Sequence, residues 1–554
     1  MSLTPRFPKR PAGRFNLLLT AEEAFPALET LALEARRTLW LGFRVFDPTT
    51  RLHGPAREVA ADWAGLIERK LEEGVEVRLL LSDFDALGRA ELHRATWESL
   101  QALTEIARAS RPDGLHLLPA LHDAHAKGLT RLVLGPAAIA AVGHRCRELN
   151  ELPEDARREA YAAMPGLWRA IRIDQDGQAR WRIGHLPRLT PGTLHQKLAV
   201  ADGEHAVIGG LDVDERRYDN LNHSRPAEET WHDASVLVEG PVADDIARHF
   251  AEQWNHHRAR ASEALDLYGA YRPDHAEPLP LPPAPCDVPA AKTDLASAND
   301  PHLQMLRTLS FRSREPGSSL FPRPAIRELL SAHLNLIRRA RRLIYIETQF
   351  FRSRRIARAL ARAARANPDL GLILILPTAP EDIAFKGRLS LAERFGDHLQ
   401  VRCLDKVTRA FGSRAAILSP ARRVPDRQPG RQRIAGAEMI YVHAKVAVCD
   451  DAVAIVSSAN LNGRSLHWDT EAGVLCTDQK RVAHLSARLQ AHWYPASMPE
   501  TGATGAEQAA NWAKTAAHEA TLAPAARTSL LVPHCTAAAR QDAVPVPGAP
   551  GELV

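Results

Sequence analysis

The segments LHQKLAV (Leu194–Val200) and YVHAKVAV (Tyr441–Val448) each place a His-x-Lys triplet inside an apolar strand. Side chains two residues apart on a β-strand face the same side, so each histidine and its lysine point into one space. Such a pair offers a nitrogen nucleophile or acid beside a fixed cation, and a reaction at a phosphodiester requires both. The two segments therefore predict two half-sites for phosphoryl chemistry.

Both triplets continue in the same way along the chain. Four residues separate each lysine from an aspartate, Asp202 or Asp450, and six more lead to a turn of small residues. The turns read Gly209-Gly210-Leu211-Asp212 and Ser457-Ser458-Ala459-Asn460. A third triplet, His125-Ala-Lys127, has Leu132 in place of the aspartate, so we interpret His125 as an ordinary structural or surface residue. Two long matches in register are not a chance pattern.

The residues around the triplets repeat one order of elements. We expect strands at residues 38–45 and 75–81 in the first part and at 370–376 in the second, alternating with helices at residues 61–74 and 356–367. Alternation of strands and helices indicates an α/β fold with mixed or largely parallel sheets. The recurrence indicates an internal duplication, so we expect two pseudo-symmetric halves, each a β-sheet flanked by helices.

Composition changes mark the boundaries between these parts. The expected divisions are a first half over residues 1–271, a Pro-rich linker over 272–301, a second half over 302–500, and a tail over 501–554. Each half contains one of the two triplets. The tail is expected to form a short Ala-rich helix followed by disordered residues.

The composition is that of a soluble globular protein, with 45% hydrophobic and 25% charged residues. No apolar run approaches the roughly 18 residues that span a bilayer, and the first 20 residues lack the pattern of a secretory signal. We therefore expect a cytoplasmic protein without a transmembrane segment. The six cysteines show no CxxC spacing, which argues against a zinc site or a disulfide framework. Net charge is +5, and the excess of arginine over lysine suits an anionic partner or reflects a compositional bias.

Five further segments extend the pattern beyond the triplets. With them, most of residues 30–500 resembles the phospholipase D superfamily, whose signature is HxKx4D followed by a Gly/Ser-rich turn and Asn, twice in one chain. The segments are more similar to plant, animal and related bacterial phospholipases D than to the short nucleases of the superfamily. They read IGGLDVDERRYD (208–219), WHDASVLVEGP (231–241), LQMLRTLS (303–310), IYIETQFF (344–351) and SSANLNGRSLHWDTE (457–471). The resemblance implies a bilobal phospholipase D-type fold.

The resemblance also implies catalytic roles. One histidine attacks phosphorus and forms a phosphohistidine, while the other protonates the leaving oxygen and later activates water. By resemblance we assign His195 as nucleophile and His443 as general acid, and the pseudo-symmetry leaves the reverse assignment open. The other candidates are the phosphate-holding Lys197, Lys445 and Asn460, the imidazole-orienting Asp233 and Glu471, and the motif aspartates Asp202 and Asp450, which we expect to support the strand and turn.

A second group of residues is predicted to bind substrate or line the pocket: Asp212, Arg307, Glu347, Gln349 and Ser458. Asp212 stands where the motif has asparagine, so its phosphate-binding role is open. Ser457 replaces the usual glycine, which is tolerable unless its φ is positive. We expect no cofactor and no catalytic metal, because a lysine two residues from each histidine would oppose a divalent cation. The arginines between residues 338 and 365 fit a solvated helix face better than a binding patch, and the loop 421–433 is better placed for anionic headgroups.

The expected activity is hydrolysis of phosphatidylcholine-like lipids to phosphatidic acid, with transfer of the phosphatidyl group to alcohols as a further reaction. Alternatives are a cardiolipin-synthase-like phosphatidyltransferase, a nuclease of the same superfamily, and an inactive lipid-binding protein. An aromatic content of 6% argues against base stacking, and two intact triplets argue against an inactive protein. The expected partner is a phospholipid at a membrane surface, with peripheral attachment and no stable nucleic acid. A monomer is expected because both half-sites lie in one chain.

Overall fold

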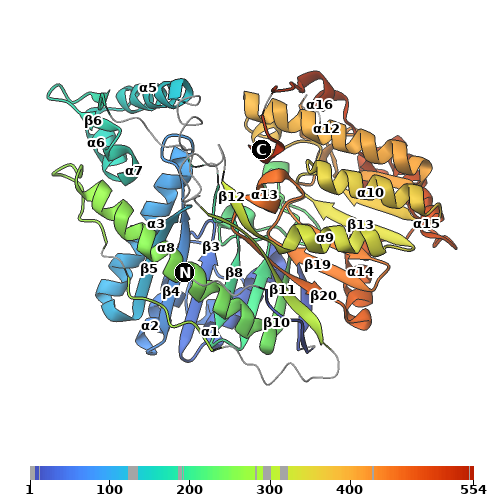
Figure 1. The fold of residues 1–554 in the computed structure, drawn as a ribbon, viewed down its shortest axis with the longest axis horizontal. Helices are drawn as coiled ribbons and strands as arrows, with labels where there is room; N and C mark the ends of the chain where they lie inside the picture. The colour runs from blue at the N-terminus through green and yellow to red at the C-terminus, as the bar shows by residue number, and fades with distance from the viewer. Residues whose placement is uncertain are drawn as a thin grey trace.

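A computed structural model describes residues 6–553 except 12, 123–134, 185–189, 191, 281–282, 291–300, 312–321, 388, 427–429 and 548. The triplet of His125 and Lys127, with Leu132 after it, lies outside the described residues. The first half (blue to green) and the second half (yellow to red) lie side by side in Figure 1, each with helices on its outer side.

The first half is built on a seven-stranded sheet in the order β2-β10-β9-β8-β3-β4-β5. Strands β3, β4 and β5 are parallel, and the remaining pairs are antiparallel. The parallel strands read as near-continuous apolar runs because helices cover both of their faces. The strands are β2 (Phe15–Leu19), β3 (Thr38–Phe43), β4 (Glu76–Asp83), β5 (Leu115–Leu121), β8 (Leu198–Ala201), β9 (His205–Gly209) and β10 (Ala234–Glu239).

The second half repeats this sheet strand by strand. Its core order is β11-β20-β19-β18-β13-β14-β15, again with the pairs β13/β14 and β14/β15 parallel and the others antiparallel. The strands are β11 (Pro301–Phe311), β13 (Leu343–Thr348), β14 (Gly371–Ile375), β15 (Ala415–Pro425), β18 (Lys445–Cys449), β19 (Val453–Ser457) and β20 (Glu471–Cys476). Additional strands extend the sheet to twelve: β1 (Arg10–Pro11), β12 (Arg323–Arg327), β16 (Arg433–Ile434), β17 (Ala437–Met439) and β21 (Leu531–Pro533). The prediction of an α/β fold with two pseudo-symmetric halves is confirmed.

The two sheets share one hydrophobic core. Strands β9 and β10 of the first half lie against β19 and β20 of the second. Ile208 and Val236 from one sheet and Val456 and Val474 from the other belong to one cluster of fully buried side chains. Each Å² of apolar surface that is removed from water here stabilises the folded chain by roughly 25 cal/mol. The shared core therefore joins the two halves into a single unit.

Helices cover the outer faces of both sheets. In the first half these are α1 (Thr20–Glu34), α2 (Trp63–Glu72), α3 (Ala90–Ala109) and the long α8 (Pro241–Gly269). A small cluster at the upper left of Figure 1 comprises α5 (Gly135–Glu151), α6 (Glu154–Ala162), α7 (Pro165–Trp168), β6 (Ile171–Ile173) and β7 (Ala179–Trp181). The second half has α9 (Glu328–Arg339), α10 (Arg354–Ala366), α11 (Glu381–Ala384), α12 (Leu391–Phe411), α13 (Gly463–His467) and α14 (Gln479–Trp493).

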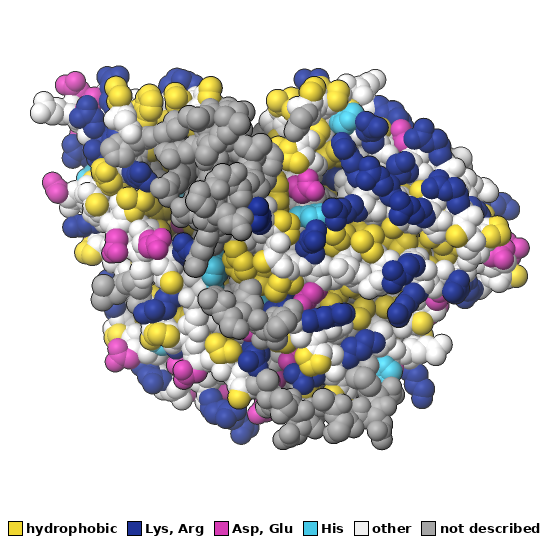
Figure 2. Space-filling model, viewed as in Figure 1, with side chains coloured by type: hydrophobic (Ala, Val, Ile, Leu, Met, Phe, Trp, Pro, Cys, Tyr) yellow, Lys and Arg dark blue, Asp and Glu magenta, His cyan; other side chains and the backbone are white. Residues whose placement is uncertain are grey.

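Helix α10 shows how the arginine-rich sequence folds. Ser353 caps it by accepting the backbone N–H of Ile356, and Ile356, Leu360 and Ala364 recur at helical spacing on the buried face. The arginines at 354, 355, 358, 362 and 365 are exposed, as are those at 338, 339, 341 and 342. Figure 2 shows basic side chains gathered over the second half. Arg352, which belongs to the same arginine-rich stretch, is buried.

The prediction of a disordered tail is wrong. Residues Gly505–Thr521 form the expected Ala-rich helix, α15, but the chain then returns as β21, which pairs with β15, and continues into α16 (Ala537–Asp542). Trp512 and Leu531 are fully buried in the shared core. A few apolar residues are enough to order this segment, because each packs against a hydrophobic face that the two sheets already provide. No helix in the described part of the chain is long and apolar enough to cross a membrane.

Candidate active site

Each His-x-Lys triplet enters the middle of its sheet. The first runs into β8, which pairs with β3, and the second into β18, which pairs with β13. The residue between histidine and lysine points the other way, as strand geometry requires. Gln196 Oε1 lies 2.6 Å from His249 Nε2 on α8, whereas His195 and Lys197 face the joint between the halves.

Each catalytic-candidate histidine is paired with a carboxylate of the opposite half. His195 Nδ1 lies 3.1 Å from Glu471 Oε2, and His443 Nδ1 lies 2.6 Å from Asp233 Oδ2. When its carboxyl group is ionised, each pair favours the Nδ1–H tautomer of the imidazole, because a carboxylate accepts. The described residues provide no hydrogen-bond partner for Nε2 of either ring, so both Nε2 atoms are left for a substrate. The two residues are only 8% and 7% exposed, which keeps bulk water away.

Backbone bridges fix these crossed pairs. His195 N–H donates to Thr470 O at 2.8 Å, one residue before Glu471. His443 N–H donates at 2.7 Å to the carbonyl of His232, one residue before Asp233. The same arrangement thus occurs twice, and it ties each triplet to the carboxylate segment of the other half.

The small-residue turns leave room for the carboxylates. A Cβ on Gly210 would lie 2.1 Å from Asp233 Oδ1, so only glycine fits there. The equivalent Ser458 is fully buried and donates its hydroxyl to Glu471, so it holds a carboxylate rather than facing substrate. Ser457 is not among the described non-glycine residues with positive φ, which explains why it replaces glycine without strain.

Two buried lysines supply positive charge. Lys197 Nζ donates to His195 O at 2.8 Å and lies 3.5 Å from Asp212 Oδ2. Lys445 Nζ donates to His443 O and lies 2.8 Å from His443 Nδ1. Burial lowers the pKa of Lys197, and it lowers the pKa of Lys445 to about 7. Burial therefore destabilises the charged form of both lysines until an anion binds beside them.

Burial also shifts the pKa values of the two histidines and of the two carboxyl groups, in each case toward the uncharged form. Burial and then the neighbouring lysine lower the pKa of His195 and of His443 well below 6.5. Burial raises the pKa of Asp233, and it raises the pKa of Glu471 to about 8. His195 is among the charges that act on His443, so the two rings titrate in one coupled site.

The motif aspartates lie at the far ends of the two strands. Asp202 follows His195 by seven residues, which is about 23 Å of strand. Its carboxylate accepts the backbone N–H groups of residues 36, 37 and 38, and Asp450 accepts those of 341, 342 and 343, all at 2.7–2.9 Å. Both have positive φ, 54° and 53°. They anchor the starts of β3 and β13, which is the support of strand and turn that was expected of them, so they do not belong among the catalytic residues.

The structure contradicts the predicted substrate-binding roles of Arg307 and Glu347. Arg307 is fully buried, forms a bidentate ion pair with Glu328, and lies 4.5 Å from the ring centre of Phe7. It links β11 to α9 instead of meeting phosphate. Glu347 is fully buried behind the site, where its carboxylate contacts His232 at 2.8 Å and accepts the Trp493 indole N–H at 2.7 Å.

Gln349, Asn460 and Asp212 lie nearer the triplets. Gln349 accepts a hydrogen bond from Asn460 Nδ2 at 3.0 Å and donates one to the Tyr441 hydroxyl at 2.8 Å. Asn460 Oδ1 is buried with no hydrogen-bond partner among the described residues. Asp212, the counterpart of Asn460, accepts the backbone N–H groups of Arg44 and Val45 at 3.1 and 3.0 Å, which occupies it structurally.

Sequence reasoning missed three arginines and a tryptophan near the site. Arg44 and Arg464 are among the charges that lower the pKa of His195, and Arg217 acts likewise on His443. The Trp231 ring centre lies 4.7 Å from that of His443 and 3.7 Å from the Arg217 guanidinium carbon. Trp231, Arg217 and Arg464 stand in segments that the sequence marks, whereas Arg44 carries no motif signal.

Two family models match parts of this chain, and one of them contains the second triplet. A family model described as "Cardiolipin synthase, PLD-like domain" matches residues 333–493, which include the second triplet, and one described as "Phospholipase D" matches residues 220–356. Phospholipase D1 of Saccharomyces cerevisiae is 27% identical over 360 residues, covering 51% of this chain and 20% of the relative. Phospholipase D2 of Bos taurus is 23% identical over 508 residues, covering 85% of this chain and 50% of the relative.

The chain thus spans half or less of the length of these two relatives. Among solved structures, a phosphatidylserine synthase of Haemophilus influenzae Rd KW20 aligns with a TM-score of 0.48 at 14% identity, covering 91% of this chain and 90% of that one. The family models and the phospholipase D relatives together support the phospholipase D superfamily as the family that this chain resembles.

Proposed function

We propose that this protein is a phospholipase D-type phosphodiesterase that releases headgroups from phospholipids through a phosphohistidine intermediate. The observation that carries the proposal is the pair of crossed His–carboxylate contacts, His195 with Glu471 and His443 with Asp233. They present two Nε2 atoms to one space lined by buried lysines. A phosphodiester needs a nucleophile, an acid and cations at one place, and this joint combines all three.

In the first half-reaction, neutral Nε2 of His195 forms a bond to phosphorus. The bond from phosphorus to the headgroup oxygen breaks, and that oxygen takes the proton from His443 Nε2. Burial and Lys445 lower the pKa of His443 in the free site, so the ring takes up its proton when the anionic phosphodiester binds, and Asp233, at 2.6 Å from Nδ1, stabilises the protonated form. The ammonium groups of Lys197 and Lys445 offset the negative charge of the non-bridging oxygens, and the amide N–H of Asn460 donates a hydrogen bond to them. The phosphate in turn stabilises the two buried ammonium groups.

In the second half-reaction, water approaches from the side that the headgroup has left. His443 Nε2 takes a proton from this water, its oxygen bonds to phosphorus, and the bond to His195 breaks. Phosphatidic acid leaves and both histidines return to their starting states. An alcohol that enters in place of water would give a phosphatidyl alcohol by the same steps.

The choice of a lipid over a nucleic acid substrate is supported by the phospholipase D relatives, two of which match 51% and 85% of this chain. The exposed arginines of α9 and α10 add a basic surface, which suits peripheral binding to an anionic bilayer. Both half-sites lie in one chain, which supports a monomer as the active form.

The test compares substrates on one purified preparation. Vesicles of choline-labelled phosphatidylcholine should release choline, and a primary alcohol should divert product to a phosphatidyl alcohol. A His195→Ala, His443→Ala double variant controls for contaminating enzymes. Cleavage of plasmid DNA without lipid turnover would instead identify a nuclease. Headgroup transfer to glycerol-type alcohols without hydrolysis would support the second candidate, a phosphatidyltransferase, which the "Cardiolipin synthase, PLD-like domain" match to residues 333–493 favours.

A further inference from the structure

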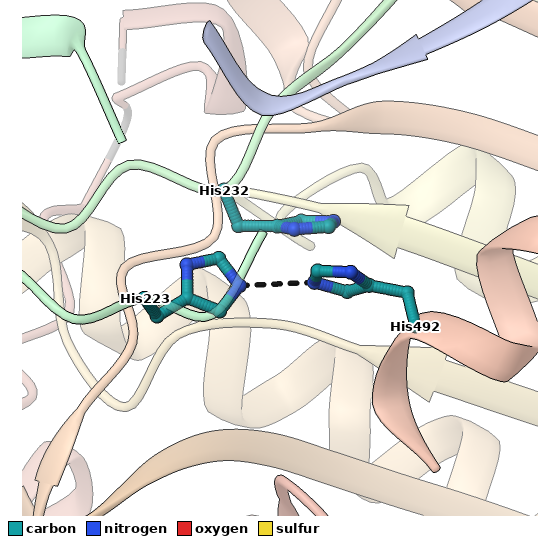
Figure 3. Close-up of side chains that lie close together, drawn as sticks. All are labelled: His223, His232 and His492. Carbon is teal, nitrogen blue, oxygen red and sulfur yellow. Dashed lines mark hydrogen bonds between the residues drawn. The ribbon is translucent and has the colours of Figure 1, made fainter. Parts of the chain in front are cut away.

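Three histidines that the proposed chemistry does not use converge at the joint between the halves. His223 and His232 come from the first half, and His492 lies at the end of α14 in the second (Figure 3). One ring nitrogen from each lies within 4.8 Å of the others. His223 and His232 are buried, and His492 is partly exposed, which gives a small ion a route to the cluster.

Two carboxylates determine which nitrogens carry protons. His223 Nδ1 lies 2.7 Å from Asp219 Oδ2, and His232 Nε2 lies 2.8 Å from Glu347 Oε2. Because carboxylates accept, these two nitrogens carry the hydrogens. The opposite nitrogens, His223 Nε2 and His232 Nδ1, therefore carry lone pairs.

Of these two lone pairs, one has a hydrogen-bond donor, the N–H of His492. His223 Nε2 lies 2.9 Å from His492 Nε2, so His492 donates to it when no ion is bound (Figure 3). His232 Nδ1 is buried and has no hydrogen-bond partner among the described residues. A buried acceptor without a donor is destabilising, and a cation that all three nitrogens can coordinate would remove the deficit.

We propose that His223, His232 and His492 bind a divalent transition-metal ion of the zinc class. Three imidazole nitrogens with a fourth position for water form a common tetrahedral set for such ions. At Zn–N distances of about 2.0–2.1 Å, the nitrogens of a tetrahedral site lie about 3.3 Å apart. The His223 and His492 nitrogens, now 2.9 Å apart, need to separate by only a few tenths of an ångström.

The surroundings of the cluster suit a metal ion. Asp219 and Glu347 would orient the ligands, as carboxylates behind metal-bound histidines commonly do. Their charges offset those of Arg422 and Arg488, which reach the cluster.

The ion would join the two halves at a point behind the catalytic site. Its His232 ligand lies between Trp231 and Asp233, and the backbone carbonyl of His232 holds the N–H of His443. The ion itself has no place in the phosphoryl transfer steps, since each catalytic-candidate histidine uses Nδ1 for a carboxylate and Nε2 for substrate. The bound ion therefore stabilises the joint, and the inference stands whether or not the proposed lipid activity does.

Metal binding to the tag-free full-length chain tests this inference. After chelator treatment and desalting, Co²⁺ should bind at one ion per chain with the visible absorption of a tetrahedral site, and Zn²⁺ should displace it. Zn²⁺ should also raise the melting temperature. His492→Gln and, separately, His223→Asn should weaken Co²⁺ binding by about a hundredfold or more. His223→Asn suits the positive φ of 49° at that position.

His484→Gln is the matched control, because His484 is exposed on the same helix and lies outside the cluster. This variant should bind Co²⁺ like the unaltered chain. Circular dichroism of the metal-free variants checks that they fold. Equal Co²⁺ binding by the unaltered chain and by folded His492→Gln would overturn the inference. An unaltered chain that neither binds Co²⁺ nor melts higher with Zn²⁺ would do the same.

Discussion

Nδ1 of His443 lies 2.6 Å from Oδ2 of Asp233, although 210 positions separate the two residues and they belong to different halves of the protein. His195 and Glu471 repeat this relationship in the opposite direction. Each half therefore supplies one histidine and orients the histidine of the other. The site is a property of the joint between the halves.

Separated halves should be inactive. Residues 1–290 lack Glu471 and residues 291–554 lack Asp233, so neither fragment can fix its imidazole or present two Nε2 atoms. Turnover of a soluble p-nitrophenyl phosphodiester should fall to background for each fragment and return in part when the two are co-expressed. Appreciable turnover by either fragment alone would contradict a shared site.

Substitution of the orienting carboxylates should affect catalysis more than stability. Asp233→Asn and Glu471→Gln keep the side-chain shape but remove the charge that stabilises a protonated imidazole, so kcat should fall by about 10²–10⁴ with little change in KM. The measurement is steady-state kinetics on the soluble diester, with melting curves beside it.

Asp202→Asn is the matched control, because Asp202 accepts three backbone N–H groups about 23 Å along the strand from His195. It should keep most of kcat while the free energy of unfolding falls by about 1–3 kcal/mol. Should Asp202→Asn lower kcat as far as Asp233→Asn does at a temperature where both are folded, the assigned roles would be wrong.

The two histidines should differ in the intermediate that they allow. In His443→Ala, a p-nitrophenol leaving group needs no acid, so His195 is still phosphorylated and the intermediate accumulates because no base activates water. In His195→Ala no phosphoenzyme forms. Mass spectrometry of the peptide around Leu194–Val200 after acid-free quenching should show the adduct in the first variant. An adduct on the peptide containing His443 would reverse the assignment.

The pH profile should be limited by Lys445 on the alkaline side. Burial lowers its pKa to about 7, so the ammonium loses its proton as pH rises through that value, and kcat should fall above it, because the bound phosphodiester keeps the His443 acid protonated. On the acid side, burial and Lys197 hold the pKa of His195 below 6.5, so loss of the neutral nucleophile should begin only below that pH. Lys445→Ala should be slow and lack the alkaline limb. An alkaline limb that persists unchanged in this variant would assign it to another group.

The phosphoryl chemistry should not require a metal ion. Lys197 and Lys445 supply the charge that metals supply in other phosphodiesterases, so excess EDTA should change turnover of the soluble diester little at a temperature well below melting. The melting temperature itself should fall if the three-histidine ion is removed. A hundredfold loss of turnover that zinc or magnesium specifically restores would disprove the lysine-based mechanism.

Much of the fold was predictable because its signals are local or repeated. Strands β3, β4 and β14 are apolar runs, α10 has helical periodicity, and the order of elements recurs around the two triplets. The tail was not predictable in this way, since Trp512 and Leu531 are too sparse to indicate an element until a sheet face is present to receive them.

The candidate site likewise has a part that local sequence patterns predict and a part that depends on tertiary contacts. The sequence alone determined that His195 shares a face with Lys197 and His443 with Lys445, because spacing within a strand dictates which side chains share a face, and the resemblance implied that the two pairs form one site. Only the tertiary structure decided that Asp233 serves the opposite triplet. It likewise decided that Arg307 and Glu347 are buried in ion pairs and hydrogen bonds away from the phosphate, and that three histidines meet behind the site. Such contacts join residues a hundred or more positions apart, and they depend on how two sheets pack, which no local pattern of residues encodes.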